Sequence, residues 1–150
     1  MKNLIVSLAT VLATGLAPAF AHATNDNPRA EKVFAQQFAG AENVKWTELS
    51  DDYLKASFTL SGIRVEAYFN QDGELQGTLR NLFYNQLPLA VMQTVSHKFN
   101  GAVIVEIKEI TNNDGTSYRI VLEQKNKKYN LKLSSFGEIT EQEREKIKLN

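Results

Sequence analysis

The chain has 150 residues, of which 17 are lysine or arginine and 17 are aspartate or glutamate, so its formal net charge at pH 7 is zero. This balance argues against nucleic acid as the main partner, because proteins that bind nucleic acid present a basic face. The chain has no cysteine. A cysteine-ligated metal site and disulfides are therefore excluded, and stability has to come from a hydrophobic core.

Residues 1–21 have the features of a secretory signal peptide. Lys2 gives a positive start, and the apolar run at 4–16 is too short to span a bilayer. Small residues fit cleavage after Ala21, and cleavage after Ala23 is a second option. No cysteine follows the run, so we expect no lipid anchor and no membrane anchor. Residues 22–150 are expected to form one periplasmic or secreted domain.

The first predicted helix covers residues 28–38, with Asn27 as its cap, Pro28 at its first position and Gly40 at its end. Four strands are expected next, because apolar and polar residues alternate. They cover residues 43–49, 53–60, 63–69 and 74–82. Asp72-Gly73 is typical of a hairpin turn, and Leu75 and Leu79 are predicted to face the core.

The second half of the chain is predicted to repeat this order. A helix with Pro88 near its start is followed by strands at 102–110, 117–124, 127–133 and 137–139, and the charged end is expected to fray. Phe38 matches Phe99 at an offset of 61 residues. Val65 matches Tyr129 at an offset of 64, and an insertion of three residues in a hairpin turn would explain the change.

These patterns predict an α+β fold built as a tandem repeat of a helix plus a four-stranded antiparallel sheet, at residues 28–81 and 88–140. Both helices are expected to pack on one face of a curved sheet of about eight strands. The other face would stay open, and Trp46 is predicted to lie in the core or at its rim.

The open face is the candidate binding site. Tyrosine and arginine anchor protein interfaces, because they combine a large contact area with hydrogen bonding. The predicted site residues are Tyr53, Arg64, Tyr68, Arg80 and Arg119. The alternative interpretation is that they are ordinary solvent-facing strand residues, since tyrosine is also common in strands.

Motifs for catalysis, cofactors and metals are absent from the sequence. It contains no phosphate loop, nucleophile elbow or zinc-protease motif. His97 stands alone on the polar side of the second predicted helix, without a second ligand at metal spacing. Glu66 is the obvious candidate if a carboxylate is used for acid–base work, but its role as an ordinary charged residue on an open strand is strongly favoured. We therefore expect no enzyme activity, no cofactor and no metal.

The chain resembles the PepSY-like proteins of Gram-negative bacteria, which are related in fold to the beta-lactamase inhibitor protein. The matching segments are VFAQQF, VKWTEL, VEAYFNQDGEL, LPLAVMQTV and YNLKLSSFGEI. The resemblance implies a non-enzymatic tandem-repeat protein that binds or regulates a peptidase or another extracytoplasmic protein. This chain lacks the cysteines of the inhibitor protein, and none of the inhibitory residues can be transferred to it.

Two functions remain open at this stage. The first is a binding module that meets a protein or peptide through its open sheet face. The second is a carrier that holds a small apolar ligand between the helices and the sheet. A cavity lined by Phe34, Phe58, Val95 and Leu122 would favour the carrier.

Overall fold

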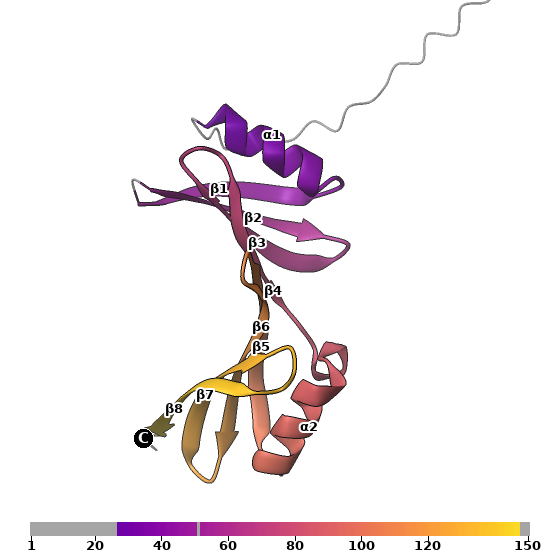
Figure 1. Ribbon diagram of the computed structural model, residues 1–150, viewed down its shortest axis with the longest axis vertical. Coiled ribbons are helices and arrows are strands. Elements are labelled where there is room, and N and C mark those ends of the chain that lie inside the picture. Colours follow the sequence, from indigo (N-terminus) through magenta and orange to yellow (C-terminus); the bar gives the residue numbers. More distant parts are fainter. Residues whose placement is uncertain (1–26, 51, 148–150) are drawn as a thin grey trace, which may run out of the picture.

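The computed structural model describes residues 27–50 and 52–147 (Figure 1). The predicted signal peptide therefore lies outside the described residues. The first half comprises α1 (Pro28–Gln37), β1 (Glu42–Ser50), β2 (Tyr53–Leu60), β3 (Ile63–Asn70) and β4 (Leu75–Asn81). The second half comprises a short 3-10 helix, η1 (Tyr84–Gln86), followed by α2 (Leu89–Lys98), β5 (Val103–Asn112), β6 (Gly115–Gln124), β7 (Lys127–Ser134) and β8 (Ile139–Lys146).

The eight strands form one antiparallel sheet in which each strand pairs with the next along the chain. The sheet does not close, so β1 and β8 are its edges. The predicted α+β class and the predicted single sheet of about eight strands are confirmed.

The ends of the first helix follow from the residues that the sequence places there. The Asn27 side-chain oxygen accepts hydrogen bonds from the backbone N–H groups of Arg29 (3.2 Å) and Ala30 (3.1 Å), which would otherwise lack partners. Pro28 occupies the first turn. Gly40 follows the helix with φ = +82°, a conformation that glycine adopts without strain.

Two separate hydrophobic cores lie under the two helices. In the first, Phe34 of α1 packs against Phe58 of β2, with ring centroids 4.9 Å apart, and Trp46 is buried beside them. In the second, Val91 and Val95 of α2 join the buried residues Ile107, Tyr118, Ile120, Leu122, Leu131 and Leu133. The two clusters share no buried residue.

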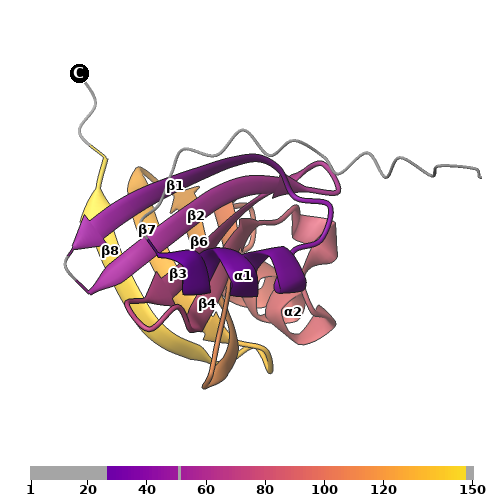
Figure 2. The ribbon, with the colours of Figure 1, turned by 90° about the horizontal axis from the view of Figure 1, so that it is seen from above.

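Both helices lie on the same face of the sheet. The strand register runs from Val65, in the first core, across Arg80 and Glu109 to Tyr118, in the second core. Residues paired directly across strands point to the same face, so the two cores lie on one side. Figure 2 shows both helices on this side, and Figure 1 shows that the sheet curves away from them. We call the uncovered side the concave face.

The last strand is longer than the sequence predicted. Residues 140–146, which were expected to fray, continue β8 and pair with β7 as far as the Lys127–Lys146 pair. Lys132 Nζ lies 2.8 Å from Glu141 Oε1 across this ladder. The segment alternates charged and polar residues rather than apolar and polar ones, so it lacks the pattern from which strands are predicted.

Candidate functional site: the concave sheet face

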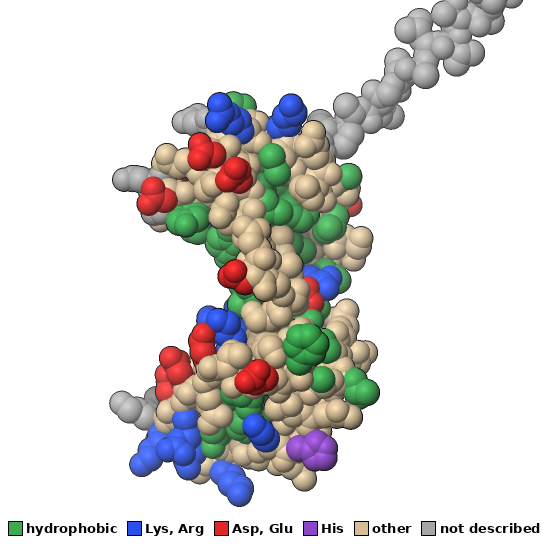
Figure 3. Space-filling view, in the orientation of Figure 1, with side chains coloured by type: hydrophobic (Ala, Val, Ile, Leu, Met, Phe, Trp, Pro, Cys, Tyr) green, Lys and Arg blue, Asp and Glu red, His purple; other side chains and the backbone are tan. Residues whose placement is uncertain are grey.

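The concave face is a hollowed surface formed by every second residue of the strands. Figure 3 shows the hollow between the upper and lower halves of the molecule, with acidic side chains above it and both basic and acidic side chains below it. Within the described residues, both α-helices are engaged with the two cores on the opposite side. Nothing in the described chain therefore covers the concave face.

Four of the five predicted site residues lie on this face. Tyr53, Arg64 and Tyr68 pair with Asn70, Thr59 and Lys55, in the phase opposite to the buried residues of β2 and β3. Arg119 pairs with Lys108 and Lys132 and alternates with the buried residues of β6. Tyr53 is 47% exposed, and the Arg64 side chain is 72% exposed.

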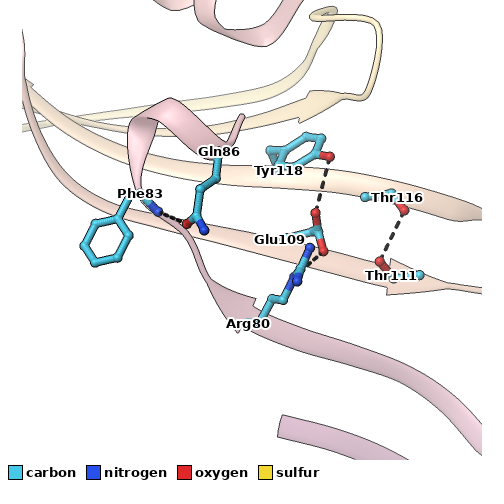
Figure 4. Close-up of polar contacts among 7 residues, drawn as sticks. All are labelled: Arg80, Phe83, Gln86, Glu109, Thr111, Thr116 and Tyr118. Carbon is cyan, nitrogen blue, oxygen red and sulfur yellow. Dashed lines mark hydrogen bonds and ion pairs between the residues drawn. The ribbon is translucent and has the colours of Figure 1, made fainter. Parts of the chain in front are cut away.

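The prediction for Arg80 is wrong, because this residue lies on the helix side. It pairs with Val65 and Glu109, and its Nε is 2.6 Å from Glu109 Oε1 (Figure 4). Leu79, predicted to face the core, lies on the concave face opposite Glu66 and Ile110. The cause is a bulge between Leu75 and Gly77. One extra residue exchanges the two faces of the strand beyond it.

Arg80, Glu109 and Tyr118 form a polar cluster between the two cores on the helix side (Figure 4). The Tyr118 hydroxyl donates to Glu109 Oε2 at 3.4 Å. Burial, followed by the charge of Glu109, raises the pKa of Tyr118. The Glu109 carboxylate raises the pKa of Arg80. Because each charged group here faces a partner within the cluster, the cluster ties β4 to β5 rather than offering a free reactive group.

Glu66 stands at the centre of the concave face of β3. It accepts a hydrogen bond from the Tyr68 hydroxyl at 2.8 Å, and Lys55 Nζ and Arg64 Nη2 each lie 3.9 Å from its Oε1. Burial and this hydrogen bond raise the pKa of Tyr68 to about 12. The carboxylate is thus held among donors and cations, an arrangement that fixes these side chains on the concave face.

Two adjoining hollows lie near the middle of the sheet, the first on the concave face and the second at the ends of β4 and β5, where concave-face residues meet residues of the second core. The first, which we call the central hollow, has a volume of about 380 Å³ and is lined by Arg64, Glu66, Tyr68, Leu79, Asn81, Glu106 and Lys108. The second, the rim hollow, has a volume of about 690 Å³ and is lined by Asn81, Leu82, Phe83, Tyr84, Ile104, Val105, Glu106, Ile107, Val121 and Lys128. They share Asn81 and Glu106, so the polar hollow leads directly into a more apolar one.

Sequence reasoning missed Lys108 and Val105 as surface residues. A bulge between Ile104 and Glu106 in β5 leaves Val105 exposed and places Lys108 opposite Arg119. Ile107, which follows Trp46 by the same offset of 61 residues that relates Phe38 to Phe99, is buried as Trp46 is. The consecutive apolar residues at 103–105 break simple alternation, and this irregularity is the signal that could have revealed the bulge.

The described residues contain no group of three or more histidine, cysteine, aspartate or glutamate side chains that could hold a metal ion. His97 is exposed on α2. No helix in the described part of the chain is long and apolar enough to cross a membrane.

The residues proposed to line a carrier cavity do not come together. Phe34 and Phe58 belong to the first core, whereas Val95 and Leu122 belong to the second. A small apolar cleft of about 70 Å³ does lie between α1 and β1, beside Phe34, Phe38, Val44 and Trp46. It is formed within the first half alone, so the predicted ligand site between helices and sheet has no common cavity.

Solved structures share this architecture, although no protein-family profile matches the chain. A BLIP-like protein from Bacteroides fragilis superposes with a TM-score of 0.69 at 22% identity, over 77% of this chain and 84% of that one. The fold is BLIP-like. A DUF2874 family protein from Bacteroides ovatus gives a TM-score of 0.72 at 20% identity, over 81% and 89% of the two chains.

A third structure, of a candidate periplasmic protein from Bacteroides eggerthii, has a TM-score of 0.72 at 16% identity and covers 81% of this chain and 90% of its own. A search of characterised proteins by sequence finds no match. At these identities the likeness establishes the BLIP-like fold and leaves the function to be argued from the site.

Proposed function

We propose that this chain is a non-catalytic, exported binding module that docks a protein or peptide through its concave face. The observation that carries the proposal is the uncovered, hollowed face on which Arg64, Tyr68 and Lys108 converge at the central hollow. A concave surface with tyrosine and arginine at its centre matches the composition of protein interfaces. The BLIP-like fold is consistent with a PepSY-like binding or regulatory role.

The arrangement of Glu66 further supports a binding role. A surface that binds tightly benefits from side chains already fixed in the free protein, because less conformational entropy is lost on association. Tyr68, Lys55 and Arg64 are all held around one carboxylate. The N-terminal segment supports export, as does the similarity to a candidate periplasmic protein.

We also propose that the two halves are copies of one unit. Each begins with a helix, continues with four strands and contains a glycine turn that touches its own helix. A Cβ at Gly73 would lie 2.6 Å from the Ala30 nitrogen of α1, and one at Gly137 would collide with the Ala90 carbonyl of α2. This shared role would explain why both halves contain Gly-Glu followed by an apolar residue.

The proposed function is tested by capture of partners from an extract of the exported compartment, with the mature protein as bait. Tyr68→Ala and Arg64→Ala should weaken capture by about 1–2 kcal/mol, or roughly tenfold. Phe136→Ala and Arg144→Ala are matched controls. Phe136 is exposed on the β7–β8 turn beside α2, and Arg144 pairs with Tyr129 on the helix side. Equal capture by all four variants and the wild type would refute the proposal.

A further inference from the structure

Three basic side chains follow one another across neighbouring strands of the concave face. Lys108 of β5 pairs with Arg119 of β6, and Arg119 pairs with Lys132 of β7. We call Lys108, Arg119 and Lys132 the basic row. Directly paired side chains have their Cβ atoms about 5 Å apart, and like charges at this spacing repel each other.

The two lysines each have a carboxylate within ion-pair distance, but Arg119 has none among the described residues. Lys108 Nζ lies 2.9 Å from Glu106 Oε1, and Lys132 Nζ lies 2.8 Å from Glu141 Oε1. Arg119 is exposed between them and makes no ion pair with any residue in the described part of the chain. The hydrogen bond and charge of Lys132 lower the pKa of Glu141, and the charge of Arg119 adds to this effect. The free protein still has three cations in the row beside two ion-paired carboxylates, and like charges at this spacing cost stability.

We propose that the basic row is the docking point for an acidic segment of a protein partner, with one carboxylate of that segment bound by Arg119. This inference rests on the proposed function and names the chemistry of the partner. The guanidinium can hold a carboxylate with two parallel hydrogen bonds. The incoming negative charge would also relieve the repulsion within the row.

A protein segment fits this face better than a nucleic acid. Glu106, Glu123 and Glu143 share the face with the basic row, and they would repel a chain that carries a charge at every residue. Val121, two residues beyond Arg119, lines the rim hollow with Phe83 and Val105. The site therefore suits a carboxylate followed by an apolar side chain, a combination that proteins offer and nucleic acids do not.

The test is a titration of the isotope-labelled mature protein, followed by amide NMR, with two capped peptides. One is acetyl-Leu-Glu-Phe-Glu-amide, and the other has glutamine in place of both glutamates. We expect the acidic peptide to shift the amides around Lys108, Arg119, Val121 and Lys132, and the glutamine peptide to bind about tenfold more weakly. Arg119→Gln should lose the preference for the acidic peptide, Arg119→Lys should keep part of it, and Arg144→Gln on the other face should keep all of it.

Three outcomes overturn the inference. In the first, the acidic peptide binds Arg119→Gln as tightly as the wild type, and in the second it shifts no amide in the row. In the third, a short oligothymidylate shifts the same amides more strongly than the acidic peptide, which would favour a nucleic acid.

The two experiments distinguish failure of the proposed function from failure of the inference about an acidic partner. If the acidic peptide fails while Tyr68→Ala still weakens partner capture, only the acidic partner is refuted. If the acidic peptide binds at the row while Tyr68→Ala captures partners normally, docking at the central hollow is refuted.

Discussion

Phe58 shows how a single side chain attaches the first helix to the sheet. It is 2% exposed, and its ring lies 4.9 Å from the rings of both Phe34 and Phe38. Aromatic pairs in edge-to-face geometry stabilise a core beyond the area that they bury. The alternation of β2 alone predicted that this residue points inward, and its burial confirms that prediction.

Phe58→Ala should therefore reduce the free energy of unfolding by about 3–5 kcal/mol, since it leaves a cavity beside the rings of Phe34 and Phe38. The single tryptophan, Trp46, lies in the same core, so its fluorescence during urea denaturation measures the effect. Phe136→Ala, at a site that is 88% exposed, should change stability by less than about 0.5 kcal/mol. A loss below about 1 kcal/mol for Phe58→Ala would contradict the packing described.

Tyr68 makes stability depend on pH in the alkaline range. Its pKa is raised to about 12 by burial and by the hydrogen bond to Glu66, whereas an unfolded tyrosine titrates near 10. The folded state therefore favours the neutral phenol. The contribution of this raised pKa to the free energy of unfolding is fully present below pH 10 and is lost as the pH rises through 12.

The melting temperature of the wild type should consequently fall more steeply between about pH 10 and 12 than that of Tyr68→Phe. Tyrosinate absorbance, followed with pH, should show one fewer late-titrating group in the variant. If the melting temperatures of the two proteins fell equally between about pH 10 and 12, the Tyr68–Glu66 hydrogen bond would not form in solution.

At the scale of the elements, regular alternation was predictable from the sequence and its interruptions were not. The buried positions of β2 and β3, the Asn27 cap and the helix-ending glycine follow from local patterns. Beyond the bulge at Gln76, every side chain of β4 changes face. Arg80 therefore left the candidate site, and Leu79 entered it. A bulge depends on how two strands pair, which alternation within one strand cannot reveal.

The basic row was only partly predictable for the same reason. Arg119 lies on a strand with regular alternation, and its face was predicted correctly; Lys132 pairs directly with it on β7, whose alternation is also regular. Lys108 follows the bulge in β5, so its position opposite Arg119 required the register of the folded sheet. The strand β8 has no apolar periodicity, so alternation could not predict it. Its pairing with β7 holds it in the sheet.

The two glycine turns give a prediction at this scale. Gly73 and Gly137 have φ = +80° and +81°, and a Cβ added to either would collide with a helix backbone. Gly40 and Gly101 have φ = +82° and +75°, and a Cβ added there would meet nothing within 4 Å. Alanine at Gly40 or Gly101 should cost about 1 kcal/mol through backbone strain alone. Alanine at Gly73 or Gly137 should cost clearly more, because the helix must also move.

Urea denaturation of the four variants measures these costs, with circular dichroism reporting both halves of the molecule. A common origin of the halves predicts that the two turn variants lose similar amounts. Equal losses for Gly73→Ala and Gly40→Ala would show that the turn does not hold the helix in place.

At the scale of the whole molecule, the β4–β5 ladder joins the two halves of the sheet and thereby the two cores. This ladder has five residue pairs, from Gly77–Asn112 to Asn81–Lys108. On the helix side the joining residues are polar, with the Arg80–Glu109 ion pair and a Thr111–Thr116 hydroxyl contact of 3.2 Å (Figure 4). The junction thus shapes the concave face without adding an apolar core of its own.

This separation predicts that the second half can lose stability without the first. Leu131 is buried in the second core, so Leu131→Ala should remove about 2–5 kcal/mol there. We expect faster amide hydrogen exchange in α2, β6 and β7, with wild-type rates in α1, β2 and β3, because regions with separate cores open separately. Trp46, in the first core, should keep its fluorescence midpoint in urea. Phe58→Ala is the reciprocal control and should accelerate exchange in the first half alone. Equal acceleration of both halves by either variant would mean that the five-pair ladder couples the cores into one cooperative unit, and that the concave face opens only by global unfolding.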